Sequence, residues 1–135
     1  MIPVILYLIL LLGFSEPDYS SASDGIFKTE TGKVGFVSKA SLENIKATSD
    51  KLRGVIDINS RRLAFTVPVS TFEGFNSPLQ KTHFNENYLQ TAIFPNANFE
   101  GKLIDVVSLQ KDGTYNVKSV GKLTIHGVGK EIMVS

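Results

Sequence analysis

Apolar and polar residues alternate along most of the chain after Asp24, which is typical of strands that bury one face. Each strand predicted from this pattern presents a single apolar face, so the sheet must close on itself or pack against a second sheet. The chain is therefore predicted to be all-β. The alternation is clearest over residues 34–38, 52–58, 62–67 and 99–103.

The alternation predicts one further long strand over residues 115–125. Tyr115, Val117 and Leu123 share one parity, and the opposite parity is mostly polar. Asp112–Gly113 precedes this strand and indicates a tight hairpin, because such turns need positive φ values. Residues 130–134 resemble the beginning of another strand.

One segment departs from the two-residue period. Ser77 is a suitable N-cap, Pro78 suits the first helical position, and Gln80 follows the cap by three residues. We therefore predict a short helix from about residue 78 to residue 86, inside a long crossover between strands. Loops of this length in compact domains are usually lids or binding loops. Aromatic residues flank the predicted helix, namely Phe72, Phe75, Tyr88 and Phe94.

The N-terminal residues 2–14 are almost continuously apolar. This run is shorter than the ~20 residues that a membrane-spanning helix needs. It fits a secretory signal peptide, and Ser20, Ser21 and Ala22 are small enough for cleavage after Ala22. We predict a signal peptide over residues 1–22 and a domain over residues 23–135. We expect this domain in the periplasm or outside the cell, with no stable membrane span after cleavage. Two alternative interpretations of the run are kept, a buried helix and an uncleaved membrane anchor, because no Lys or Arg precedes the run.

Charge and cysteine content exclude several classes of function. The 14 Lys and Arg residues are scattered among 13 Asp and Glu residues, whereas a nucleic-acid binder normally carries a basic stripe. The absence of Cys excludes thiol catalysis, disulfides and cysteine-linked lipid anchors. We therefore expect no nucleic-acid partner.

No motif in the chain predicts catalysis or metal binding. His83 and Glu86 have a spacing that suits a metal, but a site needs three or four ligands and no third partner is evident. Neither a Gly-x-Ser-x-Gly elbow nor a phosphate-binding loop occurs. We predict no catalytic residue, no metal and no enzyme. The large apolar residues either fill the core or line a cavity, since a barrel of about eight strands can do both.

Three stretches of the chain resemble the YceI-like family of lipid- or polyisoprenoid-binding domains. The resemblance covers nearly all of the chain after the apolar run. The first stretch, residues 35–57, runs from Gly35-Phe36-Val37-Ser38 to Gly54-Val55-Ile56-Asp57. The second, residues 77–99, runs from Ser77-Pro78-Leu79-Gln80 through His83-Phe84-Asn85-Glu86-Asn87-Tyr88 to Phe99, and the third is Gly121-Lys122-Leu123-Thr124-Ile125-His126-Gly127-Val128.

The resemblance implies a lipocalin-like antiparallel barrel with a short helix in a long crossover and an apolar tunnel. The residues it implies for the tunnel wall are Phe36, Phe65, Phe99, Tyr115 and Val117. The residues it implies for the crossover near the tunnel mouth are Phe72, Leu79, His83 and Phe84. It also implies strands beyond Ser135, so we expect the barrel to lack C-terminal strands.

The resemblance favours an exported, non-catalytic carrier that holds an isoprenoid quinone, a polyprenyl lipid or another long apolar ligand. We expect no cofactor other than such a bound lipid. The alternative is a structural or protein-interaction domain whose barrel is filled by its own side chains. A homodimer stays open, and the ligand itself is not identified by the sequence.

Overall fold

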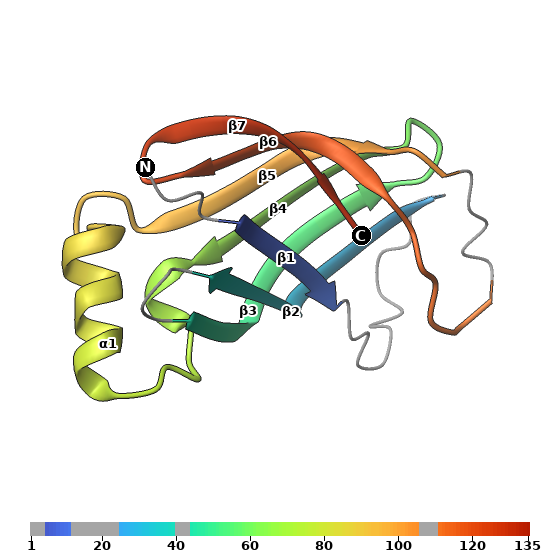
Figure 1. Ribbon diagram of the computed structural model, residues 1–135. Coiled ribbons are helices and arrows are strands. Elements are labelled where there is room, and N and C mark those ends of the chain that lie inside the picture. The colour runs from blue at the N-terminus through green and yellow to red at the C-terminus, as the bar shows by residue number, and fades with distance from the viewer. Residues whose placement is uncertain (1–4, 12–24, 40–43, 106–110) are drawn as a thin grey trace.

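Seven strands form one antiparallel sheet, in which every strand pairs with the next strand in the sequence (Figure 1). The structure is a computed structural model that describes residues 5–11, 25–39, 44–105 and 111–135. The prediction of an all-β fold is confirmed. The strands are β1 (Ile5–Leu11), β2 (Ile26–Lys39), β3 (Asn44–Asp57), β4 (Arg62–Pro68), β5 (Asn96–Leu103), β6 (Ser119–Ile125) and β7 (Val128–Val134).

The sheet curls into a barrel-like shape, with β1 and β7 as its two outer strands (Figure 1). These two strands approach each other. Within the described residues, however, no hydrogen-bonded ladder joins them. The barrel is therefore open at this seam, as the expectation of an incomplete barrel required.

The inner face of the sheet is built by the predicted alternation. Phe65 of β4 lies opposite Phe99 of β5, and Phe99 in turn lies opposite Leu123 of β6. All three side chains are buried. The strand positions on either side of them are less buried, so one parity faces the core and the other faces outward.

Two facing glycines allow β5 and β6 to approach closely. Gly101 pairs directly with Gly121. A Cβ atom added at Gly101 would lie 2.3 Å from the carbonyl oxygen of Val120, and one added at Gly121 would lie 2.2 Å from that of Glu100. Neither strand could keep this path with a larger residue, so the pair supports the curvature of the sheet.

The crossover, which we define as residues 69–95, covers one end of the barrel (Figure 1). It contains the helix α1 (Pro78–Thr82), which continues into a π-helical segment, His83–Tyr88. The predicted cap is confirmed, because the Ser77 hydroxyl accepts a hydrogen bond from the Gln80 amide at 3.1 Å. The Gln80 side chain accepts from the Asn76 amide, one residue before the cap, and not from the cap itself as in a capping box.

Two local predictions are wrong. The strand predicted from residue 115 begins only at Ser119, because the Lys118 amide donates to the Asp105 side chain (2.9 Å) and not to a strand partner. Asp112–Gly113 forms no tight hairpin, since β5 ends at Leu103 and the connection to β6 is long. Residues 106–110 of that connection lie outside the described part of the chain.

The apolar N-terminal run contains a strand. Ile5–Leu11 pairs with β2 in a register that runs from Ile5 opposite Lys39 to Leu11 opposite Lys33. The alternative of a buried helix is therefore wrong for these seven residues. The predicted cleavage after Ala22 lies outside the described residues, and the signal peptide stays a prediction. No described helix is long and apolar enough to cross a membrane.

Candidate functional site

The candidate site is the concave inner face of the sheet together with the crossover that covers one end of it. Register and burial assign the inner positions of β4, β5 and β6 to one continuous apolar wall. The wall consists of Leu63, Phe65, Val67, Ala97, Phe99, Gly101, Leu103, Ser119, Gly121, Leu123 and Ile125. Such a wall can enclose a ligand tail or pack against other side chains of the chain.

At the crossover end, four phenylalanines form an aromatic cluster, defined as Phe36, Phe72, Phe75 and Phe84. The ring of Phe84 stacks on that of Phe36, with 5.2 Å between centroids and 14° between planes. Phe72 packs edge-on against Phe36 at 5.2 Å, and Phe75 packs against Phe84 at 4.9 Å. The rings contact one another directly, so at this end the chain fills its own interior.

Five of the nine predicted ligand-binding residues are buried in the core, and they form two groups. Phe36, Phe72 and Phe84 belong to the aromatic cluster. Phe65 and Phe99 lie opposite each other on the inner wall, and the Phe65 ring covers Gly54 so closely that a Cβ there would lie 2.2 Å from it. The structure therefore brings together the aromatic residues that the sequence singled out, whereas their role in binding stays a prediction.

The other four predicted residues do not join these groups fully. Val117 packs partly against the core. Leu79 and His83 lie on the exposed side of the helical segment, and Leu79 is 62% exposed. Tyr115 is not on the tunnel wall, because it precedes β6, is 38% exposed, and donates its hydroxyl to the Lys111 carbonyl. His83 and Glu86 are both exposed, and no group of three potential metal ligands occurs among the described residues.

Both ends of the crossover are fastened to the barrel. Near its start, Glu73 exchanges two backbone hydrogen bonds of 2.8 Å with Thr48 of β3. Near its end, a hydrogen bond of 2.8 Å joins the Gln90 side chain to His126 in the β6–β7 turn. The Phe94 ring packs edge-on against His126, at 5.0 Å between centroids. These attachments hold the crossover over the end of the barrel.

The turn that fastens the end of the crossover has a geometry that explains its sequence. His126 and Gly127 both have positive φ, at 55° and 71°, as a two-residue hairpin turn requires. A Cβ on Gly127 would lie 2.7 Å from the Phe94 ring, so glycine is needed for contact as well as for φ. We call Gln90, Phe94, His126 and Gly127 the clasp. In the sequence, Gly127-Val128-Gly129 indicates a turn only weakly, because long-range contacts such as these leave no local signal.

One polar atom of the crossover is buried without a partner in the described residues. The Asn85 side chain donates through Nδ2 to the Lys81 carbonyl at 3.0 Å, but its Oδ1 accepts no hydrogen bond there. A buried acceptor without a donor is unusual in a native fold and suits a water or ligand hydroxyl. Asn85 carries no signal in the sequence, because its burial depends on the tertiary fold.

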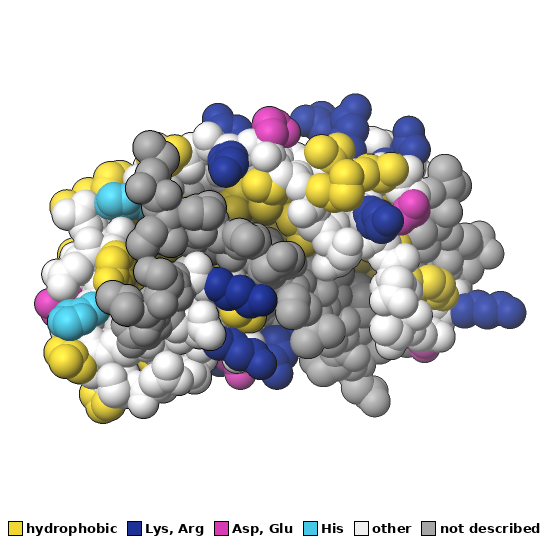
Figure 2. All heavy atoms as spheres, in the orientation of Figure 1, with side chains coloured by type: hydrophobic (Ala, Val, Ile, Leu, Met, Phe, Trp, Pro, Cys, Tyr) yellow, Lys and Arg dark blue, Asp and Glu magenta, His cyan; other side chains and the backbone are white. Residues whose placement is uncertain are grey.

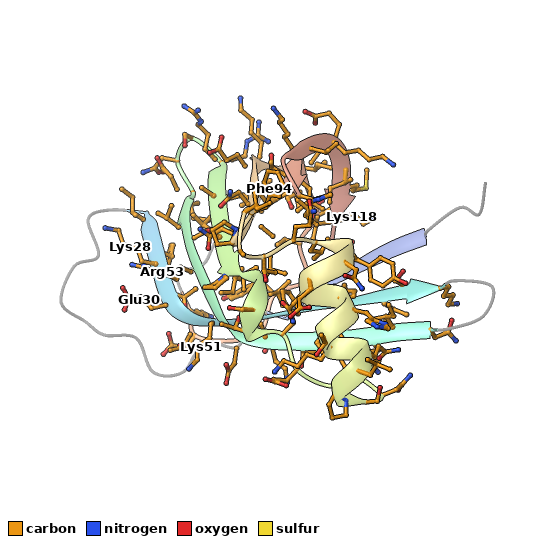
Figure 3. All side chains as sticks on the ribbon, turned by 90° about the vertical axis from the view of Figure 1, so that its left-hand side faces the viewer. Lys28, Glu30, Lys51, Arg53, Phe94 and Lys118 are labelled. Carbon is orange, nitrogen blue, oxygen red and sulfur yellow. The ribbon has the colours of Figure 1, made fainter. Side chains whose placement is uncertain are left out.

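The charged side chains of β2 and β3 lie on the outside of the barrel. Figure 3 shows Lys28, Glu30, Lys51 and Arg53 pointing away from the interior, and Arg53 pairs with Glu30 at 3.3 Å. On the outer face of β6 and β7, Val120 lies opposite Met133, and both are exposed. Figure 2 shows hydrophobic side chains among Lys and Arg on this side of the molecule. The inner and outer faces thus differ sharply in charge.

The chain was compared with known protein families and with curated proteins. The family model described as YceI-like domain matches residues 26–135, from the first residue of β2 through β7. No curated protein matches the chain. Membership in this family supports a binding or carrier role at a coarse level.

Proposed function

Because this chain belongs to the YceI-like domain family, we propose that it is a non-catalytic carrier that holds a long apolar molecule against the inner wall of its barrel. The observation that supports the proposal most directly is the continuous apolar inner face of β4, β5 and β6. Burial of apolar surface contributes roughly 25 cal/mol per Å². An isoprenoid quinone or polyprenyl tail therefore offers enough surface for tight sequestration.

The carrier proposal requires room between the inner wall and the opposite side of the barrel. The test is a variant that fills this room, Ala97→Trp, since Ala97 pairs with Val67 on the inner face and is only partly buried against the core. Asn96→Trp is the matched control, because Asn96 lies on the outer face and is exposed. Both proteins are purified without added lipid, checked for cooperative unfolding, and compared with the wild type by native mass spectrometry and lipid analysis of an organic extract.

If the protein is a carrier, a long-chain species should co-purify with the wild type and with Asn96→Trp. The amount that co-purifies with Ala97→Trp should be at least ~10-fold lower. A wild-type protein that is folded, empty and unresponsive to added quinones and polyprenols would overturn the proposal. That outcome would favour a structural or protein-interaction domain with a filled barrel. The aromatic cluster is the observation that supports this alternative, because its rings already fill the crossover end.

We further propose that the carrier is exported, with residues 1–22 acting as a signal peptide that is removed. The apolar run and the small residues before Asp24 support this proposal. Removal of residues 1–22 would take β1 out of the sheet and leave β2 and β7 as its outer strands. Expression of the full chain, fractionation and intact-mass measurement would test it. The expected product begins at Ser23 and is found outside the cytoplasm, whereas an intact N-terminus on the folded protein would contradict removal.

A further inference from the structure

The inner face of the barrel carries a single charged residue among the paired positions of the described strands β2 to β7. Leu123 pairs with Lys130, Gly121 with Ile132, and Ser119 with Val134. The three β6 residues are buried, so their partners on β7 share the inner face. Val134 is buried and Ile132 packs against the core. Lys130, two residues before Ile132, therefore belongs to the same face.

The surroundings of Lys130 are apolar and lack an acidic partner in the described part of the chain. Its row across the sheet continues through Leu123, Phe99 and Phe65 to Gly54. The ion pairs of the described residues involve Lys51, Arg53 and Lys81, and none involves Lys130. Lys130 is itself exposed, because β7 is an outer strand of the open sheet. An ammonium group thus lies where an apolar wall meets solvent.

We propose that Lys130 binds the head group of the ligand, and that the preferred ligand is an amphiphile with an acidic head such as a phosphate monoester. This inference rests on the proposed carrier function. Hydrogen bonds between an ammonium and an anionic oxygen are about twice as strong as neutral ones. The apolar row beside Lys130 would hold the first part of the tail, and the ammonium would hold the head at the open seam.

A second role for Lys130 must be separated from ligand binding. Charged residues that point inward on an outer strand also discourage pairing with other molecules. Either sign of charge would serve that purpose, whereas an acidic head group requires a positive one. Lys130→Glu and Lys130→Met therefore distinguish the two roles, because only the first keeps a charge at this position.

The experiment uses the full chain and two probes with the same C20 tail, geranylgeraniol and geranylgeranyl monophosphate. Their affinities are measured by displacement of the neutral dye Nile red, below the concentration at which either probe forms micelles. Lys122→Met is the matched control, since Lys122 lies on the outer face of β6 and pairs with Glu131. Circular dichroism verifies the fold of each variant, and Lys130→Arg tests whether a cation of different shape is sufficient.

The wild type and Lys122→Met are expected to bind the monophosphate roughly 10-fold more tightly than the alcohol, a preference that weakens at high salt. Lys130→Met should bind both probes equally, Lys130→Glu should prefer the alcohol, and Lys130→Arg should keep most of the wild-type preference. Equal affinities in the wild type, or a preference that survives in Lys130→Met, would overturn the inference and leave the carrier function intact. Failure of both probes to displace the dye from the wild type would overturn the carrier function, and this inference with it.

Discussion

At the end of the barrel that the crossover covers, four phenylalanine rings meet, whereas towards the opposite end the inner wall carries Gly101, Gly121 and Ser119. The first region gains stability from the volume of its side chains. The second region requires small residues, since the backbones of β5 and β6 leave no room for a Cβ atom at the paired glycines. The same sheet is thus sensitive to opposite changes at its two ends. Two substitutions test this contrast, and a third tests the clasp.

The largest effect is expected from removing a ring of the aromatic cluster. Phe84→Ala should lower the free energy of unfolding by about 3–5 kcal/mol, because the buried ring contacts Phe36, Phe72 and Phe75 and would leave a cavity. Urea denaturation followed by circular dichroism measures this loss. Tyr88→Ala in the same helical segment is the control, since Tyr88 is 59% exposed and its removal should change stability by only about 0.5 kcal/mol. Equal effects of the two substitutions would contradict the contrast.

The second effect is expected from adding a methyl group where the strands approach. Gly121→Ala should destabilise the fold by about 1–3 kcal/mol, because the new Cβ would meet backbone atoms of Glu100 and Gly101 that cannot move aside. Gly129→Ala is the matched control on β7. Its Cβ would meet the end of the flexible Lys122 side chain, which can move. Denaturation curves that rank Gly129→Ala as the more harmful change would show that the close approach is not required.

The smallest effect on global stability is expected at the clasp. His126→Asn keeps a residue that tolerates positive φ but removes the ring that packs on Phe94. Hydrogen exchange measured by mass spectrometry should accelerate roughly fivefold over residues 85–95, as expected for a local opening made easier by about 1 kcal/mol. The free energy of unfolding should change by less than about 1 kcal/mol. Unchanged exchange in that segment would show that the start of the crossover alone keeps it closed.

The sequence was sufficient for the parts of the fold that depend on local pattern. The period-two alternation predicted β2, β4 and β5, and Ser77 with Pro78 predicted the start of the helix. The strand predicted over residues 115–125 was too long at its N-terminal end, because apolar alternation does not reveal that the Asp105 side chain binds the Lys118 amide. A local pattern reports which side a residue faces, but not which distant group satisfies its backbone.

The candidate site was predictable to the same extent. The large aromatics were identified from their size and parity, and five of the nine named residues are buried in the core. Lys130 was not selected, because its inward position becomes visible only when β7 is registered against β6. The clasp was also missed, since it joins residues separated by 36 positions in the chain. Features formed by pairing distant segments require the tertiary structure.

The strictly sequential order of the strands has a consequence for how the chain folds. Every ladder of the described strands joins neighbours in the sequence, so no strand depends on a distant strand for its partner. Contacts of low sequence separation favour fast folding, and only the β4–β5 pair must wait for the intervening crossover. The contact between Gln90 and His126 requires β6 as well as the crossover, because His126 directly follows the last residue of β6. The sheet is therefore expected to form from local pairings, whereas closure of the crossover depends on the prior pairing of β5 with β6.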